Sequence, residues 1–242
     1  MKVIIHSIAC PRIEVDFVEH WIQHHLNLGI SKLYIYNLGV DLFYDSKPEY
    51  IKKGDNVERV AARRKHMDVD TRTTAEIETL WNSILAKYPD VIETKPNLSS
   101  YTRNRGSYDT IQRILNTSEN EKYIKAGVDW MVNTDIDEYL CGDLKFLESL
   151  PKDTAHVQLS QKVYADRWDD KGYPRKFSLD ETPLTDKMLT ICQKNIVRPL
   201  ALQSWRNIHY DVILFPGYNK IWGEENIYFK HFRGAGYKDT AK

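Results

Sequence analysis

The hydrophobic positions at the start of the chain follow two different periods. Residues 2–9 form a short apolar run, which predicts a buried strand, and a Cys-Pro-Arg triplet at 10–12 ends it. From Glu14 to Leu28 the apolar residues recur at helical spacing, and Gly29 follows as a helix-ending residue. Lys32 to Asn37 is apolar again and predicts a second strand. A strand, a helix and a strand in this order indicate a βαβ unit with parallel strands.

The rest of the pattern predicts a mixed α/β chain. We expect further helices over 46–54, 71–88, 103–115 and 144–150, and strands over 56–61 and 130–134. Beyond residue 154, polar and apolar residues alternate in segments that predict antiparallel strands, at 155–164, 194–200, 202–214 and 226–232. No repeat or linker divides the pattern, so we expect one domain over residues 1–242.

Composition narrows the function classes. Lys plus Arg and Asp plus Glu both number 34, so a net basic face of the kind that binds nucleic acid is not expected. No apolar run approaches the roughly 18 residues of a membrane span, and no signal peptide is evident. Three cysteines, far apart in sequence, fit a reducing compartment. We therefore expect a cytoplasmic protein. No feature of the sequence indicates an oligomeric state.

An acidic cluster follows the strand expected at 130–134. Asp135 and Asp137 would point to the same side of an extended chain, with Ile136 on the other side. Two carboxylates placed in this way suit Mg²⁺ or Mn²⁺. By the same alternation, Glu138 would point away from the pair and hold the turn or a nearby arginine. The alternative is a charged turn in which Asp135 caps backbone amides.

Four histidines are candidate metal ligands. His20 and His24 have the helical spacing of zinc ligands, but the glutamate of the zinc-protease motif is missing, so we expect them to pack and hydrogen-bond. His209 and His231 each lie near the end of an expected strand, and a metal held by carboxylates commonly takes one imidazole as well.

Two arginine-containing segments are candidate phosphate contacts. Arg103 and Arg105 could clamp a phosphate, or could lie solvated at a helix N-terminus. The basic run "RRKH" at 63–66 is either a solvated loop or a contact to an acidic substrate.

Several segments resemble a known enzyme family. "DFVEHWIQHHLNLGISKLYIYN", "WMVNTDIDEYL", "KNIVRP" and "KHFRG" occur in the order found in glycosyltransferase family 92 and related family-2-like glycosyltransferases. The resemblance covers residues 16–234, apart from about 60–100. It implies a single-domain GT-A fold, with a Rossmann-like mixed sheet flanked by helices and a smaller antiparallel acceptor part. The nucleotide-sugar-binding half would be 1–140, and the acceptor-binding half 141–242.

The same resemblance implies roles for particular residues. Asp137 would bind the metal directly, Asp135 would contact the ribose or reach the metal through water, and His231 would be the third ligand. The turn from Ala9 to Arg12, and Asn37 after the second strand, would border the nucleotide. The implied cofactors are Mn²⁺ (or Mg²⁺) and a UDP- or GDP-linked sugar, and the implied acceptor is a glycan or another hydroxyl compound. Animal members of the family carry a membrane anchor that is not seen here, which fits either a soluble bacterial or viral enzyme or a shortened chain.

The sequence does not settle inversion against retention, but the resemblance favours inversion, and an inverting enzyme needs a carboxylate that takes a proton from the acceptor hydroxyl. The sequence offers Asp169, Asp170 and Asp211 and does not choose among them.

Two other functions fit parts of the pattern. A non-catalytic carbohydrate-binding module would stack sugar rings on Trp168, Trp205 and Trp222. A Mg²⁺-dependent phosphatase would also use a strand followed by Asp-x-Asp, although that motif usually lies on the first strand.

Overall fold

The structure is a computed structural model. It describes residues 1–40, 68–95, 115–165, 167–169, 171–176, 178–184, 189–207, 211–223 and 225–232, with the backbone alone at 189–192, 207 and 211. The expected elements at 46–54 and 56–61, the "RRKH" run and most of the helix expected at 103–115 lie outside the described residues.

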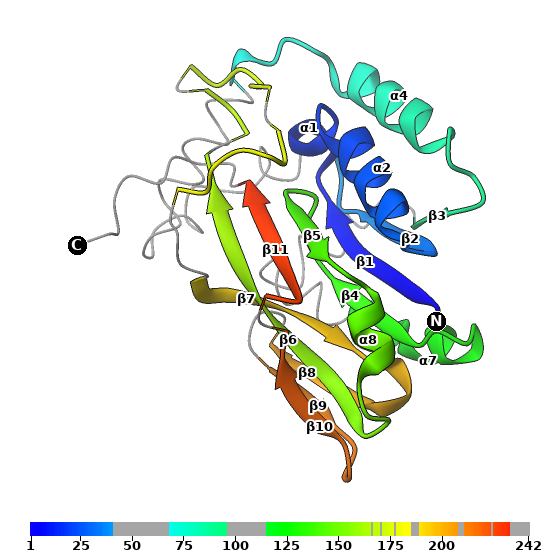
Figure 1. The fold of residues 1–242 in the computed structure, drawn as a ribbon. Coiled ribbons are helices and arrows are strands. Elements are labelled where there is room, and N and C mark those ends of the chain that lie inside the picture. The colour runs from blue at the N-terminus through cyan, green and yellow to red at the C-terminus, as the bar shows by residue number, and fades with distance from the viewer. Residues whose placement is uncertain are drawn as a thin grey trace.

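Strands and helices alternate in the first half of the described chain, and strands dominate the second half (Figure 1). The strands are β1 (Val3–Ala9), β2 (Lys32–Asn37), β3 (Ile92–Lys95), β4 (Trp130–Asn133), β5 (Glu138–Gly142), β6 (Thr154–Tyr164), β7 (Leu189–Val197), β8 (Leu202–Asn207), β9 (Asp211–Leu214), β10 (Asn219–Trp222) and β11 (Ile227–Phe232). The helices are α1 (Pro11–Glu14), α2 (Val18–Leu28), α4 (Thr74–Leu85), α7 (Asn120–Lys125) and α8 (Lys145–Ser149), with a 3-10 turn at Pro199–Ala201.

Within the described ranges, one nine-stranded mixed sheet joins strands from both halves of the chain, in the order β3-β2-β1-β4-β7-β6-β11-β5, with β10 paired to β6. The β3, β2, β1 and β4 strands are parallel, as the βαβ pattern predicts. β8 and β9 form a separate small antiparallel sheet. The mixed α/β fold class is thereby confirmed.

Several expected boundaries are wrong. The single helix expected over 14–28 is two helices, α1 and α2, separated by residues 15–17. The strand expected over 202–214 is the pair β8 and β9, because alternation alone does not mark where a strand turns back. The later strands are not all antiparallel, since β10 and β11 run parallel to β6.

Alternation along β1 builds a core on each face of the sheet. Val3 and Ile5 pack in one buried cluster with residues of α2 and α4. Ile4 and Ile8 pack in a second cluster on the other face. Figure 1 shows α2 and α4 on the same side of the β1–β2 part of the sheet. A sheet covered on both faces leaves the ends of its strands as the place for a ligand site.

Local signals explain where the two long helices begin and end. Gly29 ends α2 in the left-handed conformation, with φ of 104°, which glycine adopts without strain. α4 begins with a capping box, in which Thr73 and Glu76 each satisfy the other's backbone amide.

Candidate metal centre

The acidic segment is a turn between two strands. β4 ends at Asn133 and β5 begins at Glu138, so residues 134–137 are not extended, and the expected alternation does not apply. Glu138 does not point away from the cluster, which corrects that expectation. Its Oε2 accepts hydrogen bonds from the Asp135 amide at 3.0 Å and from Thr134 Oγ1 at 3.2 Å. Glu138 thus holds the turn, as expected, but from within the cluster.

A buried lysine from β7 neutralises one side of the turn. Lys194 Nζ lies 2.8 Å from Asp135 Oδ2 and 3.1 Å from Glu138 Oε2, and its side chain is fully buried. Burial opposes the charge on Lys194, but the two carboxylates outweigh it and raise its pKa. At Glu138 burial is the larger effect and raises the pKa of the carboxyl group, although the charge of Lys194 acts to lower it. Asp135 is therefore held by a protein cation.

A buried arginine lies on the other side. Arg167 Nη1 donates to Glu14 Oε2 at 3.0 Å, and Nη2 is 3.6 Å from Asp137 Oδ2. Burial opposes the charge on Arg167, but the neighbouring carboxylates raise its pKa. At 3.6 Å the contact with Asp137 is an ion pair without a hydrogen bond.

Strand pairing places His231 against the turn, although more than 90 residues of chain separate them. β11 pairs with β5 so that His231 lies opposite Glu138, and the Phe232 amide donates to the Asp137 carbonyl at 2.9 Å. His231 Nδ1 donates to Gln161 Oε1 at 2.7 Å. In the neutral ring this leaves the lone pair on Nε2, 3.5 Å from Asp137 Oδ2.

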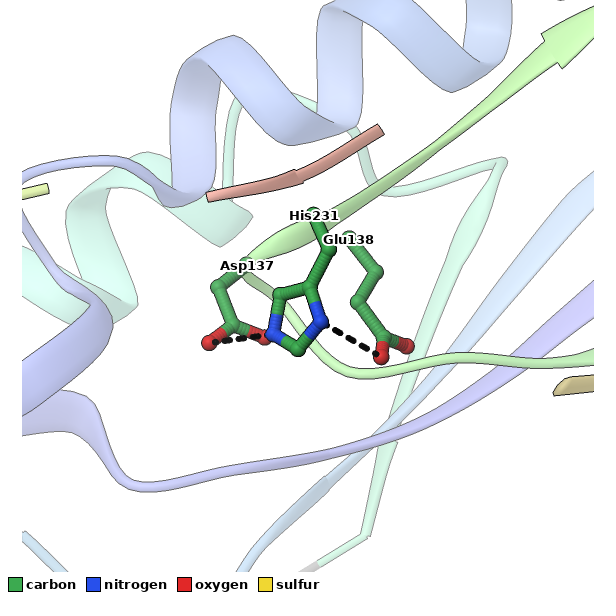
Figure 2. A group of neighbouring side chains, drawn as sticks. All are labelled: Asp137, Glu138 and His231. Atoms are coloured by element: carbon green, nitrogen blue, oxygen red, sulfur yellow. Dashed lines mark ion pairs between the residues drawn. The ribbon is translucent and has the colours of Figure 1, made fainter. Parts of the chain in front are cut away.

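The resulting donor set suits a divalent cation. Asp137, Glu138 and His231 offer ligand atoms that all lie within 4.8 Å of one another, and Figure 2 shows the imidazole ring between the two carboxylates. The four carboxylates of Glu14, Asp135, Asp137 and Glu138 face the two cations, Lys194 and Arg167. With His231 neutral, the formal charge of this group is −2. Carboxylate oxygens with one imidazole fit Mn²⁺ or Mg²⁺.

The residues expected to border a nucleotide lie at the ends of β1 and β2. Ala9 and Asn37 are register partners at the carboxyl ends of these strands. Asn37 Oδ1 accepts a hydrogen bond from the Gly39 amide at 2.7 Å and so shapes the turn after β2. Arg12 is buried, and its Nη1 donates to the Arg72 carbonyl at 2.8 Å and lies 3.5 Å from Asp70 Oδ2. Arg12 therefore ties α1 to the segment before α4.

Among the expected proton acceptors, Asp169 is exposed and forms a turn. Its Oδ1 accepts hydrogen bonds from the Lys171 and Tyr173 amides, each at 2.9 Å, and the Tyr173 amide is the main cause of its lowered pKa. Of Asp211 the backbone is described, in β9. The other expected site residues, Asp170, Arg103, Arg105 and His209, lie outside the described residues.

His20 and His24, two of the three histidines of α2, pack on β5, as the absence of a zinc-protease motif predicts. His20 Nδ1 is 3.1 Å from the Tyr139 hydroxyl, and His24 Nε2 donates to the Leu140 carbonyl at 2.6 Å. These contacts fix α2 against the strand that follows the acidic turn.

The tryptophans proposed for sugar stacking are mostly inside the protein. Trp168 and Trp205 are 5% and 3% exposed, so their ring faces are not open to a sugar. Trp222 is 42% exposed. The alternative of a carbohydrate-binding module thus loses two of its three tryptophans.

Comparisons with known proteins include a distant structural likeness. No protein-family model matches the chain, and no curated protein sequence matches it. A solved structure that matches is S. aureus TarS 1-349 in complex with UDP-GlcNAc, at 9% identity and a TM-score of 0.41. The match covers 98% of this chain and 62% of that chain. A likeness of this extent identifies neither a family nor an activity. None of the helices in the described ranges is long and apolar enough to cross a membrane.

Proposed function

We propose that this protein is a metal-dependent glycosyltransferase that moves a sugar from a nucleotide sugar to a hydroxyl acceptor, with inversion. The observation that carries the proposal is the Asp137, Glu138 and His231 donor set at the carboxyl end of β4, which together with Glu14, Asp135, Lys194 and Arg167 has a formal charge of −2 when His231 is neutral. The resemblance of "WMVNTDIDEYL" and "KHFRG" to family 92 motifs supports it, because these two segments supply all three side chains.

In the proposed site, Asp137 and His231 hold Mn²⁺ or Mg²⁺, and Glu138 adds charge beside them. Gln161 orients His231 through Nδ1, so that Nε2 faces the cation. Such a cation, when bound, stabilises the negative charge of a leaving diphosphate. Asp135 is held by Lys194, and its proposed role is to contact a ribose hydroxyl or a metal-bound water.

The remaining roles follow the resemblance. Ala9, Arg12 and Asn37, with Arg103 and Arg105, are proposed to surround a UDP- or GDP-linked sugar. The proposed acceptor is a glycan, and the candidate bases stay Asp169, Asp170 and Asp211. The proposed domain is residues 1–242, with donor-binding and acceptor-binding halves that meet at residue 140.

Thermal unfolding with UDP or GDP, each with and without Mn²⁺, tests the proposal. We expect one nucleotide to raise the melting temperature of the wild-type protein only when Mn²⁺ is present. Asp137→Asn and His231→Gln should abolish this rise, whereas Asp90→Asn, which changes an exposed carboxylate after α4, should retain it. If neither nucleotide shifts the wild-type melting temperature, the proposed function is wrong.

A further inference from the structure

Arg167 is a buried side chain with two unused hydrogen-bond donors. It is 1% exposed, and its guanidinium carbon lies 5.2 Å from the ring centre of Phe17 and 4.8 Å from that of Trp168. Nη1 donates to Glu14, whereas Nε and Nη2 have no hydrogen-bond partner among the described residues. The aromatic rings and Glu14 thus hold the guanidinium in a fixed orientation.

The two unused donors form one edge of the guanidinium. Nε and Nη2 point their N–H bonds in parallel, which is the geometry that binds two oxygens of one carboxylate or phosphate. Buried donors without an acceptor cost free energy, so such groups mark a place where an acceptor is expected. Asp137 does not supply it, because its Oδ2 lies 3.6 Å from Nη2.

We propose that Arg167 is an oxyanion-binding residue, whose Nε and Nη2 donate to a diphosphate bound beside Asp137. The nature of the anion rests on the proposed function. Nη2 lies next to Asp137 Oδ2, and Asp137 Oδ2 faces His231 Nε2. An oxyanion that reaches a cation held by Asp137 and His231 therefore comes within range of the open edge of Arg167.

The charges nearby predict that binding of the anion depends on the metal. Glu14 and Asp137 both face Arg167, and alone they repel an anion. A divalent cation reverses the sign of this region. Inorganic pyrophosphate should therefore bind with Mn²⁺ and not without it.

Isothermal titration with inorganic pyrophosphate, with UDP and with Mn²⁺ alone tests the role of Arg167. Arg167→Lys keeps the charge and removes the parallel donors, and Arg167→Gln removes both. We expect Arg167→Lys to weaken Mn²⁺-dependent pyrophosphate binding by about tenfold or more, and to leave Mn²⁺ binding within about threefold. Arg175→Lys, on the same turn and paired with Glu181, is the matched control and should bind as the wild-type protein does.

The outcomes separate this inference from the proposed function. Pyrophosphate binding that depends on Arg167, without UDP binding, would support the oxyanion site and contradict a UDP-linked sugar donor. Mn²⁺-dependent UDP binding that is equal in the wild-type protein and both Arg167 variants would overturn the oxyanion site alone. A crystal of the wild-type protein with Mn²⁺ and pyrophosphate needs no variant to fold. An anion bound to Nε and Nη2 is the expected result, and an anion bound elsewhere or none would refute the inference.

Discussion

Replacing Lys194 by methionine should destabilise the protein strongly. Lys194 is fully buried, and it is the cation between Asp135 and Glu138. Methionine has a similar length and fills the space, so the variant removes the charge with little loss of packing. Glu138 is then left buried with the hydrogen bonds from Thr134 and the Asp135 amide, but without its cation.

The cost follows from the loss of one partner of a buried ion pair, which is about 3–5 kcal/mol. Because two hydrogen bonds to Glu138 remain, we expect the lower end, about 3 kcal/mol. For a chain of this length, that corresponds to a fall in melting temperature of about 6–12 °C. Urea unfolding followed by tryptophan fluorescence measures the change in the free energy of unfolding directly.

Two further variants test the reasoning. Lys145→Met changes an exposed lysine in α8 and should stay within about 0.5 kcal/mol of the wild-type protein. The double variant Lys194→Met, Glu138→Gln should recover part of the loss, because it removes the buried unpaired charge. If Lys194→Met unfolds at the wild-type urea concentration with the same slope, the pairing does not stabilise the fold as described.

Other predictions concern pH, a crowded glycine and a helix cap. Burial lowers the pKa of His6 to about 3 and that of His25 well below its usual value, so only the unfolded chain gains these protons as the pH falls below 6.5. The free energy of unfolding should therefore be greatest above pH 6.5, and below pH 6.5 it should fall by up to about 1.4 kcal/mol per pH unit for each of the two histidines. A His6→Phe variant whose urea midpoint falls as steeply with decreasing pH as that of the wild-type protein would contradict this. At Gly142 φ is 107° and an added Cβ would lie 2.1 Å from the Asn226 carbonyl oxygen, whereas at Gly127 φ is 65° and no atom lies within 4 Å. Gly142→Ala should cost more than about 3 kcal/mol and Gly127→Ala about 1 kcal/mol in urea unfolding, and equal losses would show that the contact is harmless. Thr73→Ala should lower the free energy of unfolding by about 1 kcal/mol, and Thr73→Ser should lower it much less because serine keeps the capping hydroxyl. Equal stability of the wild-type protein and both variants would mean that the cap does not stabilise the fold.

Local periodicity predicts those helices and strands whose own sequence carries a clear pattern of buried and exposed positions. β2 has the expected bounds, α2 ends at the expected glycine, and β1, β4 and β6 lie within a residue or two of their expected ranges. β3 is four residues long and was not expected, because so short a segment carries too few alternations to be distinguished from a loop. Lys194 lies between Gln193 and Asn195 in β7, so the local sequence does not indicate that its side chain is buried or which carboxylates it meets.

The sequence by itself determined that acidic residues follow a buried strand and that a βαβ unit begins the chain. It also named Asp137 and His231 as candidate ligands, because strand ends and residue types can be recognised locally. Only the tertiary structure decided which groups meet at the acidic turn. Lys194 comes from β7, Gln161 from β6 and Arg167 from the turn after β6, and no periodicity reports contacts between such distant segments. The orientation of Glu138 also required the structure, because alternation holds only in extended chain and residues 134–137 turn.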